Sequence, residues 1–232
     1  MRVNGVVVAA GEGKRMGGDI PKPLLSIAGR PLILHTLSRF AASQVHRVIV
    51  IAGANEISKY QKLIQSDIRL RSLDCSFEIG GARRQDSVWR GLARVDPDCE
   101  VVVIHDGARP FILPDLIDRC TEVALREGAV VVGVPVRSTI KVVSSERRIV
   151  GTPPRDTLWE AQTPQVFRLP IIRQAYDEAM LEGMEATDDA MLVERLGKPV
   201  YLLEGHTTNI KITLPEDMLL AEALIREGRV VI

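Results

Sequence analysis

Short runs of β-branched and other apolar residues alternate with amphipathic stretches along the whole chain. Most of these runs are continuous rather than alternating, which is typical of strands that are covered on both faces. The runs predict strands at residues 3–10, 47–52, 76–79, 100–104, 129–134 and 200–203.

Between the runs, residues that are almost all apolar recur at the spacing of one helix face. The three sets are Ile33, Leu37, Phe40, Gln44 and Val45, then Val88, Leu92 and Val95, then Leu116, Cys120 and Val123. A last helix is predicted to run through Leu224, with Thr213 as its N-cap, Pro215 in its first turn and Glu216 as the partner in a capping box.

This alternation of strands and helices predicts an α/β fold with an open, doubly wound, mostly parallel sheet. In such sheets, ligands bind beyond the carboxyl ends of the strands. The functional residues are therefore expected in the loops that follow strands, at residues 9–22, 80–87, 105–110 and 135–141.

One segment departs from the alternation. Residues 138–150, STIKVVSSERRIV, look like two short strands joined by a polar turn. A two-stranded arm is only marginally stable alone. The arm, at about residues 136–160, is therefore expected to pack on a second copy of the chain, as a homodimer, or alternatively on its own domain. No repeat or linker divides the rest, so one domain is predicted over residues 1–232.

Composition narrows the range of partners. The 30 basic and 30 acidic residues balance, which argues against bulk binding to nucleic acid or to an anionic membrane surface. The three cysteines are odd in number and lack C-x-x-C spacing, and no secretory signal or bilayer-spanning run is evident. We expect a cytoplasmic protein with reduced thiols that binds neither nucleic acid nor membranes.

The first loop, AAGEGKRMGGDIPK at residues 9–22, is rich in glycine and carries several positively charged side chains. Its glycines let backbone amides approach a phosphate, and Lys14, Arg15 and Lys22 suit a ligand with several charges, such as a triphosphate. The loop is not a P-loop, because no Gly-Lys-Ser/Thr occurs. It is not the dinucleotide motif G-x-G-x-x-G either, because Met16 stands where the third glycine belongs.

A second candidate, Asp106, follows the fourth predicted strand in the stretch HDGARP. A carboxylate that faces a phosphate loop can hold or orient Mg²⁺, although a turn or helix-capping aspartate would look the same. Hydroxyls and cations of the second half could form a pocket for a phosphorylated polyol: Thr139, Lys141, Arg155, Thr163, Thr187, Asn209 and Lys211. Taken singly, Thr187 also suits a helix N-cap and Thr163 with Pro164 a turn.

With these segments in order, the chain resembles the 2-C-methyl-D-erythritol 4-phosphate cytidylyltransferase family of the non-mevalonate isoprenoid pathway. The resemblance covers almost the whole chain. It rests on seven stretches in family order: AAGEGKRMGGDIPK, GGARRQDSVWRGL, VVIHDGARPFI, PVRSTIK, LWEAQTPQVF, TDDAMLVE and EGHTTNIKIT.

The resemblance implies a nucleotidyltransferase (Rossmann-like) sheet, a homodimer built around the projecting arm, and CTP over the glycine loop with Mg²⁺ at its phosphates. By match, the CTP contacts are Ala9, Ala10, Gly11, Gly13, Gly81, Ala82, Ser87 and Asp106. The catalytic cations are Arg15 and Lys22, joined by Lys211. The acceptor site is Asp106, Arg109, Thr139, Arg155, Thr163, Thr187 and Lys211, with Arg155 reaching the site of the other subunit.

The implied reaction joins methylerythritol 4-phosphate to the α-phosphate of CTP and releases pyrophosphate. A phosphomonoester is largely ionised at neutral pH, since its second pKa is about 6, so no general base is needed. Two alternatives remain: a ribitol 5-phosphate cytidylyltransferase, and a non-catalytic CTP-sensing module. Some family members carry an acid where this chain has Ala82 or Thr208, so a contact to the base at Ala82 is expected from its backbone or not at all.

Overall fold

The structure, a computed structural model, describes residues 2–11 and 21–232. Its centre is a seven-stranded sheet in the order β11-β7-β10-β6-β1-β4-β5. The strands are β1 (Val3–Val8), β4 (Arg47–Ala52), β5 (Asp74–Ile79), β6 (Val101–Asp106), β7 (Ala129–Pro135), β10 (Trp159–Arg168) and β11 (Tyr201–Glu204). All pair in parallel except β10, which runs antiparallel to both β6 and β7. The predicted mostly parallel α/β sheet is confirmed.

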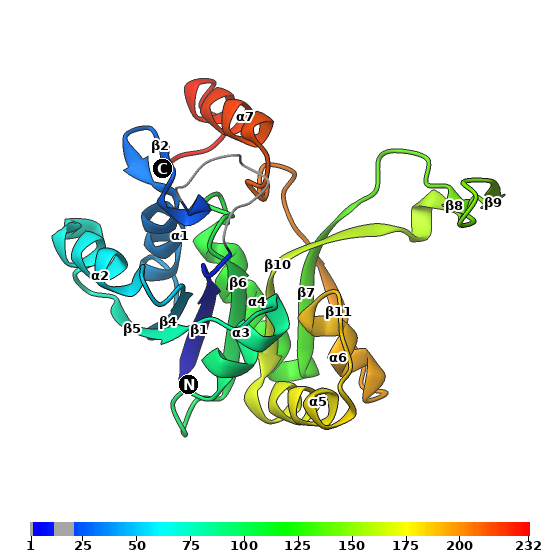
Figure 1. Ribbon diagram of the computed structural model, residues 1–232, viewed down its shortest axis with the longest axis horizontal. Coiled ribbons are helices and arrows are strands. Elements are labelled where there is room, and N and C mark those ends of the chain that lie inside the picture. The colour runs from blue at the N-terminus through cyan, green and yellow to red at the C-terminus, as the bar shows by residue number, and fades with distance from the viewer. Residues whose placement is uncertain (1, 12–20) are drawn as a thin grey trace.

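Helices cover both faces of this sheet (Figure 1). One face packs against α1 (Leu32–Ala41), α2 (Ile57–Ser66) and α4 (Pro114–Glu127). The other packs against α3 (Arg84–Leu92), α5 (Leu169–Glu182) and α6 (Asp189–Arg195). In β6, for example, Val101 and Val103 join the first core while Val102 and Ile104 join the second. Both faces are buried, which explains the continuous apolar runs.

The antiparallel strand β10 was not expected from the sequence. Its residues, WEAQTPQVFR, mix apolar with polar side chains and include Pro164, which argues against a central strand. Nevertheless Gln162, Thr163 and Gln165 are buried within it. The register against β7 shifts between Ala161 and Gln165, so Pro164 stands where the hydrogen-bonded ladder is interrupted. Thr163 and Pro164 therefore belong to a strand rather than to a turn.

Two helices end earlier than the apolar spacing suggested. Helix α1 ends at Ala41 and α3 at Leu92, so Val45 and Val95 lie beyond them, although both side chains are buried. An apolar loop residue that is buried just after a helix looks, in the sequence, like one more turn of that helix. Apolar spacing indicates which side chains are buried, not which backbone is helical.

The last helix, α7 (Pro215–Arg226), lies beyond the main sheet, near the hairpin of β2 (Ser26–Ile27) and β3 (Arg30–Pro31) (Figure 1). Its N-cap is Leu214 rather than Thr213. The capping carboxylate is that of Asp217, not Glu216: it accepts hydrogen bonds from the amides of Thr213 and Leu214 at 2.6 and 2.8 Å.

Between β7 and β10 the chain leaves the body and returns (Figure 1). Strands β8 (Val142–Val143) and β9 (Ile149–Gly151) pair antiparallel in a small sheet of their own. The short helix η4 (Arg155–Thr157) follows on the way back. Two further short helices, η2 (Lys22–Leu24) and η3 (Ile68–Leu70), complete the elements on the α1 side.

Candidate active site

Three of the loops that follow strands lie side by side at the carboxyl edge of the sheet. The amide of Ala9 donates to the carbonyl of Ile51 at 2.7 Å, and that of Gly80 donates to Ala52 at 2.9 Å. The amide of Gly107 donates to the carbonyl of Val8, also at 2.9 Å. These bonds continue the parallel ladder past the strand ends, so the sheet itself brings the loops together.

Glycine is required where two of these loops touch. A Cβ on Gly80 would lie 2.3 Å from the Cβ of Ala10, and one on Gly81 would lie 2.3 Å from the Cβ of Asp86. Gly81 is also held by Ser87, whose hydroxyl accepts from the Gly81 amide at 3.0 Å and donates to the carbonyl of Arg83 at 3.1 Å. The buried Ser87 therefore shapes the loop from beneath, and its predicted contact with cytidine stays a prediction.

Asp106, the last residue of β6, is the charged centre of this edge. Its Oδ1 accepts from Arg84 Nε at 3.1 Å, and its Oδ2 lies 2.8 Å from Lys211 Nζ and 3.6 Å from Arg109 Nε. Burial by itself raises the pKa of this carboxyl, but the charges of Arg84, Lys211 and Arg109 outweigh it and hold the pKa well below its ordinary value. One carboxylate thus faces three cations, and the cluster carries a net positive charge.

The tertiary structure brings Lys211 to Asp106 from the far end of the chain. Its segment follows β11 and is fixed by the amide of Ile212, which donates to the carbonyl of Ala108 at 2.9 Å. The Arg109 guanidinium adds a second tie, from Nη1 to the carbonyl of Asn209 at 2.7 Å. The Lys211 side chain remains 39% exposed, so its ammonium can reach a ligand as well as Asp106.

A buried hydrogen-bonded chain supports Asp106 from behind. The Asp106 amide donates to Thr163 Oγ1 at 3.1 Å, the Thr163 hydroxyl lies 3.0 Å from His105 Nδ1, and His105 Nε2 lies 3.1 Å from the carbonyl of Arg109. A carbonyl can only accept, which assigns the His105 proton to Nε2 and makes Nδ1 the acceptor of the Thr163 hydroxyl. Burial lowers the pKa of His105 to about 4, so the ring is neutral at pH 7. The Thr163 hydroxyl is thus hydrogen-bonded to the Asp106 amide and to His105.

Four residues of this cluster were not among the sequence candidates: Arg84, Asp189, His105 and Gln162. Arg84 also binds Asp189, Nη2 to Oδ2, at 2.9 Å. Gln162 accepts from the side chain of Asn209 at 2.9 Å. Arg84 and His105 could have been predicted from their position in the sequence. Arg84 lies in the loop of residues 80–87 and His105 in that of residues 105–110, and both loops were expected to carry functional residues. Nothing in the local pattern marks Asp189 or Gln162.

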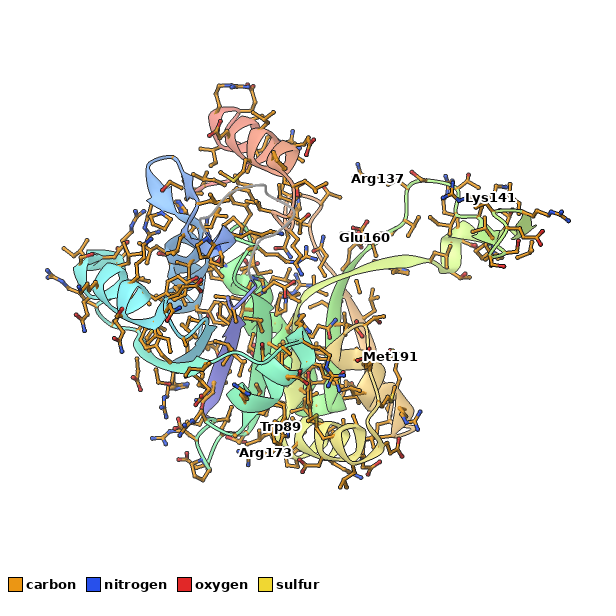
Figure 2. The ribbon with its side chains drawn as sticks, viewed as in Figure 1. Trp89, Arg137, Lys141, Glu160, Arg173 and Met191 are labelled. Atoms are coloured by element: carbon orange, nitrogen blue, oxygen red, sulfur yellow. The ribbon has the colours of Figure 1, made fainter. Side chains whose placement is uncertain are left out.

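A cavity of about 900 Å³ opens beside Asp106, between the end of β7, the start of the arm and the segment before α7. Arg109, Lys211 and Arg137 contribute positive charge to its wall, and Glu160 and Asp217 contribute negative charge. Figure 2 shows Arg137 and Glu160 where the chain enters and leaves the arm, and Lys141 further out. The cavity is polar and cationic enough to receive a small phosphorylated compound.

The other predicted acceptor-site residues lie at its periphery or beyond. Thr139 stands between Ser138 and Ile140, which both line the cavity. Arg155 belongs to η4 on the returning side of the arm, where its Nη1 donates to the carbonyl of Arg137 at 3.0 Å. Thr187 is exposed just before α6, and its N-cap is Asp188, not Thr187. Of the contacts described for Asp106, none involves Arg155 or Thr187, and their place in the acceptor site stays a prediction.

Of the predicted catalytic cations, Lys22 is described and Arg15 is not. Arg15, with Gly13 and Lys14, lies outside the described residues. Lys22 opens η2, and its charge reaches Asp217 at the start of α7. Burial raises the pKa of Asp217, but the Thr213 and Leu214 amides, the Thr213 hydroxyl and the Lys22 charge together lower it. Lys22 is therefore near enough to Asp217, which lines the cavity, for their charges to interact.

A metal held by protein ligands does not fit the residues that the structure describes. Both oxygens of Asp106 are engaged by cations. Residues 2–11 and 21–232 contain no group of three or more His, Cys, Asp or Glu side chains that could hold a metal ion. Within the part of the chain that is described, Mg²⁺ would have to displace Lys211 or Arg84 from the only carboxylate predicted for it.

Comparison with known proteins identifies the family of this chain. The model of the 2-C-methyl-D-erythritol 4-phosphate cytidylyltransferase family matches residues 3–227. The chain belongs to this family. An enzyme of that name from Geotalea uraniireducens is 46% identical over 229 residues, which cover 97% of each protein. One from Alkaliphilus oremlandii is 41% identical over 228 residues, covering 97% of this chain and 96% of that protein.

Solved structures of the family have the same fold. The crystal structure of 2-C-methyl-D-erythritol 4-phosphate cytidylyltransferase from Thermus thermophilus has a TM-score of 0.78 at 37% identity, and covers 97% of this chain and all of that one. The structure of 4-diphosphocytidyl-2C-methyl-D-erythritol synthase from Anaerococcus prevotii has a TM-score of 0.88, and the match covers 97% of this chain and 96% of that one. At 24% identity, this likeness shows the shared fold alone. Among the described helices, none is long and apolar enough to span a bilayer.

Proposed function

We propose that the chain transfers the cytidylyl group of CTP to 2-C-methyl-D-erythritol 4-phosphate, giving 4-diphosphocytidyl-2-C-methyl-D-erythritol and pyrophosphate, in isoprene biosynthesis. Family membership over residues 3–227 supports the reaction. The observation that carries it in the structure is the cationic cluster around Asp106, two of whose cations, Arg109 and Lys211, line a cavity. The loops of residues 9–11 and 80–81 lie at the same edge of the sheet as Asp106.

In this reaction an oxygen of the acceptor phosphate attacks the α-phosphorus of CTP. A bond forms from that oxygen to phosphorus, the bond from phosphorus to the bridging oxygen breaks, and pyrophosphate leaves with the electron pair. The attacking oxygen is already ionised, so the enzyme must chiefly bring two anions together and stabilise charge as it moves to the leaving group.

The chain offers separate cations for these two tasks. Arg109 and Lys211, at the cavity wall, suit the acceptor phosphate, since Lys211 keeps an exposed ammonium beside Asp106. Lys22, with Arg15, is proposed to stabilise the CTP phosphates. Ala9, Ala10, Gly11 and Gly81 are proposed to hold the cytidine moiety, which agrees with the close packing of Ala10 on Gly80.

The proposed Mg²⁺ would depend on the triphosphate for its ligands, because the described side chains do not make a site for it. Divalent ions of this kind are commonly bound through substrate phosphates with one or two carboxylates. In the transfer, the part proposed for Asp106 is to orient Lys211 and Arg109.

We also propose that the arm joins two copies of the chain. Apolar side chains are exposed on both of its strands, with Val143 of β8 at 53% and Val150 of β9 at 65% exposure. Arg155 lies on the same arm, so pairing of arms would let it enter the site of the other subunit. We propose the cytoplasm as the setting of the reaction, which the free thiols of Cys75, Cys99 and Cys120 support.

The first experiment is pyrophosphate release from CTP and Mg²⁺ with either methylerythritol 4-phosphate or ribitol 5-phosphate. Release with the erythritol compound alone is the expected result. Release with ribitol 5-phosphate alone would contradict the proposed acceptor. CTP binding without release from either compound would contradict the enzyme and favour a sensor.

A further inference from the structure

One guanidinium ties together three elements at this site. Arg84, the first residue of α3, donates from Nε to Asp106 Oδ1 at 3.1 Å and from Nη2 to Asp189 Oδ2 at 2.9 Å. Asp106 ends β6 and Asp189 begins α6. Because the guanidinium is planar and its donors are fixed relative to one another, its two carboxylate partners are held in a defined relative orientation.

Asp189 is itself held in a single arrangement. It is fully buried, and its Oδ1 accepts from the hydroxyl of Tyr176 at 2.5 Å. The amides of Asp189 and Ala190 donate to Gln165 Oε1 at 3.0 and 2.9 Å. Burial and the Asp189 charge raise the pKa of Tyr176 well above its ordinary value, so the tyrosine keeps the proton that it donates. A buried carboxylate with both oxygens bonded cannot rotate without breaking these bonds.

The fixed position of Arg84 in turn determines where the cations that line the cavity are held. With Oδ1 of Asp106 held by Arg84, Oδ2 points to Lys211 at 2.8 Å and to Arg109 at 3.6 Å. Without Arg84, the partners of the Asp106 carboxylate among the described residues would all be at Oδ2, and the carboxylate could turn about the Cβ–Cγ bond. The ammonium of Lys211 would then lose its fixed place.

We propose that Arg84 is a positioning residue for the transfer reaction: anchored by Asp189 and Tyr176, it orients Asp106 and, through Asp106, the ammonium of Lys211. The inference rests on the proposed function. It extends the machinery to Asp189 and Tyr176, neither of which lines the cavity beside Asp106.

A double-mutant cycle separates this role from a merely structural one. Arg84→Lys keeps the charge but cannot bridge the two carboxylates with one rigid group. It is expected to lower kcat/KM for the acceptor by about 10- to 100-fold, the usual cost of misplacing a group by about 1 Å. In a Lys211→Met background, the same change is expected to cost less than about threefold, because the group it positions is gone.

The matched control is Arg30→Lys. Arg30 is also a buried arginine that bonds a carboxylate, Asp67, and a second side chain, Ser38, but on the far side of α1 from Asp106. It is expected to lower the thermal midpoint without changing kcat/KM in either background. The KM for CTP is expected to change less than about twofold in Arg84→Lys, since Ser87 holds the neighbouring loop independently.

An equal loss from Arg84→Lys with and without Lys211 would overturn the positioning role. Failure of the unaltered protein to release pyrophosphate would overturn the proposed function instead, so the two outcomes are distinct. If Arg84→Lys does not fold, Tyr176→Phe, which removes one hydroxyl from Asp189, takes its place in the same cycle under the same criterion.

Discussion

At the residue scale, the site is a set of charges whose ionisation is imposed by burial and by neighbours. Asp106 stays ionised in a buried position because three cations face it. His105, one residue earlier, is buried without a charged partner for its ring and therefore stays neutral. Adjacent residues of β6 thus have opposite electrostatic roles, one charged and one uncharged.

Replacement of Lys22 by alanine tests the proposed stabilisation of the CTP phosphates. The loss of one preorganised cation is expected to reduce kcat by about 10²- to 10³-fold, while the thermal midpoint stays near that of the unaltered protein. Steady-state pyrophosphate release measures the first and calorimetry the second. Lys59→Ala, on the exposed side of α2, is the control and should keep full activity. Near-normal turnover in Lys22→Ala would contradict the role.

His105 predicts a specific dependence of stability on pH. Its pKa is about 4 in the folded protein and about 6.5 in an unfolded chain. Between these values the unfolded chain binds the extra proton, so the stability from neutral His105 is present above about pH 6.5 and is lost as the pH falls towards 4. From pH 7 to pH 4.5 this loss is about 2 kcal/mol.

Urea unfolding of the His105→Gln variant at both pH values measures that loss. Glutamine keeps a donor and an acceptor but does not titrate, so the variant should lose about 2 kcal/mol less than the unaltered protein on acidification. His46→Gln, at an exposed histidine, should behave as the unaltered protein does. Identical losses in the His105 variant and the unaltered protein would contradict the buried neutral ring.

At the element scale, the position of β10 decides what the site contains. Inserted between β6 and β7, it carries Thr163 beneath Asp106, Gln162 beside Asn209, and Gln165 beneath the start of α6. A parallel strand in that place would have exposed a different set of side chains at this edge. The polar residues that made β10 hard to recognise are the ones that connect it to the site.

The N-terminus of α7 provides a test at the same scale. Asp217→Ala removes a carboxylate that accepts from the Thr213 amide and hydroxyl and from the Leu214 amide. It is expected to lower the free energy of unfolding by about 1 kcal/mol. Glu216→Ala, one residue earlier and exposed, should change it by less than about 0.5 kcal/mol. Urea unfolding compares the two, and a larger effect of Glu216→Ala would restore the original capping prediction.

At the scale of the whole molecule, the arm separates two proposed parts of one site. Asp106 and Lys211 belong to the body, whereas Arg155 belongs to the arm that leaves it (Figure 1). If two chains exchange arms, each complete site combines the body of one subunit with the Arg155 of its partner.

Mixing two inactive variants tests this exchange. Lys211→Met disables the body and Arg155→Ala the arm, so a mixed dimer should contain one intact site of its two. After unfolding and refolding together, an equal mixture should recover about a quarter of the unaltered activity, since about half of the dimers are mixed. Each variant refolded alone is the control. Absence of recovery, with dimers present by sedimentation, would contradict a shared site.

Much of the fold could be predicted because its signals are local. The continuous apolar runs at residues 47–52 and 129–134 match β4 and β7 closely, since burial on both faces leaves few choices of residue. Asp106 was identified for a similar reason, because it lies at the end of such a run, after His105. Arg84 and Asp189 were missed, since their importance lies in a contact between residues distant in the chain.

The sequence by itself determined the alternation of strands and helices, the loops that carry chemistry, and the family to which they belong. Only the tertiary structure decided that β10 runs antiparallel within the sheet, that Asp106 faces three cations, and that Thr163 is committed to protein groups. The physical reason is that apolar periodicity records burial along one segment. Ion pairs and strand order depend instead on which distant segments meet, and here those segments bring three cations to one buried carboxylate.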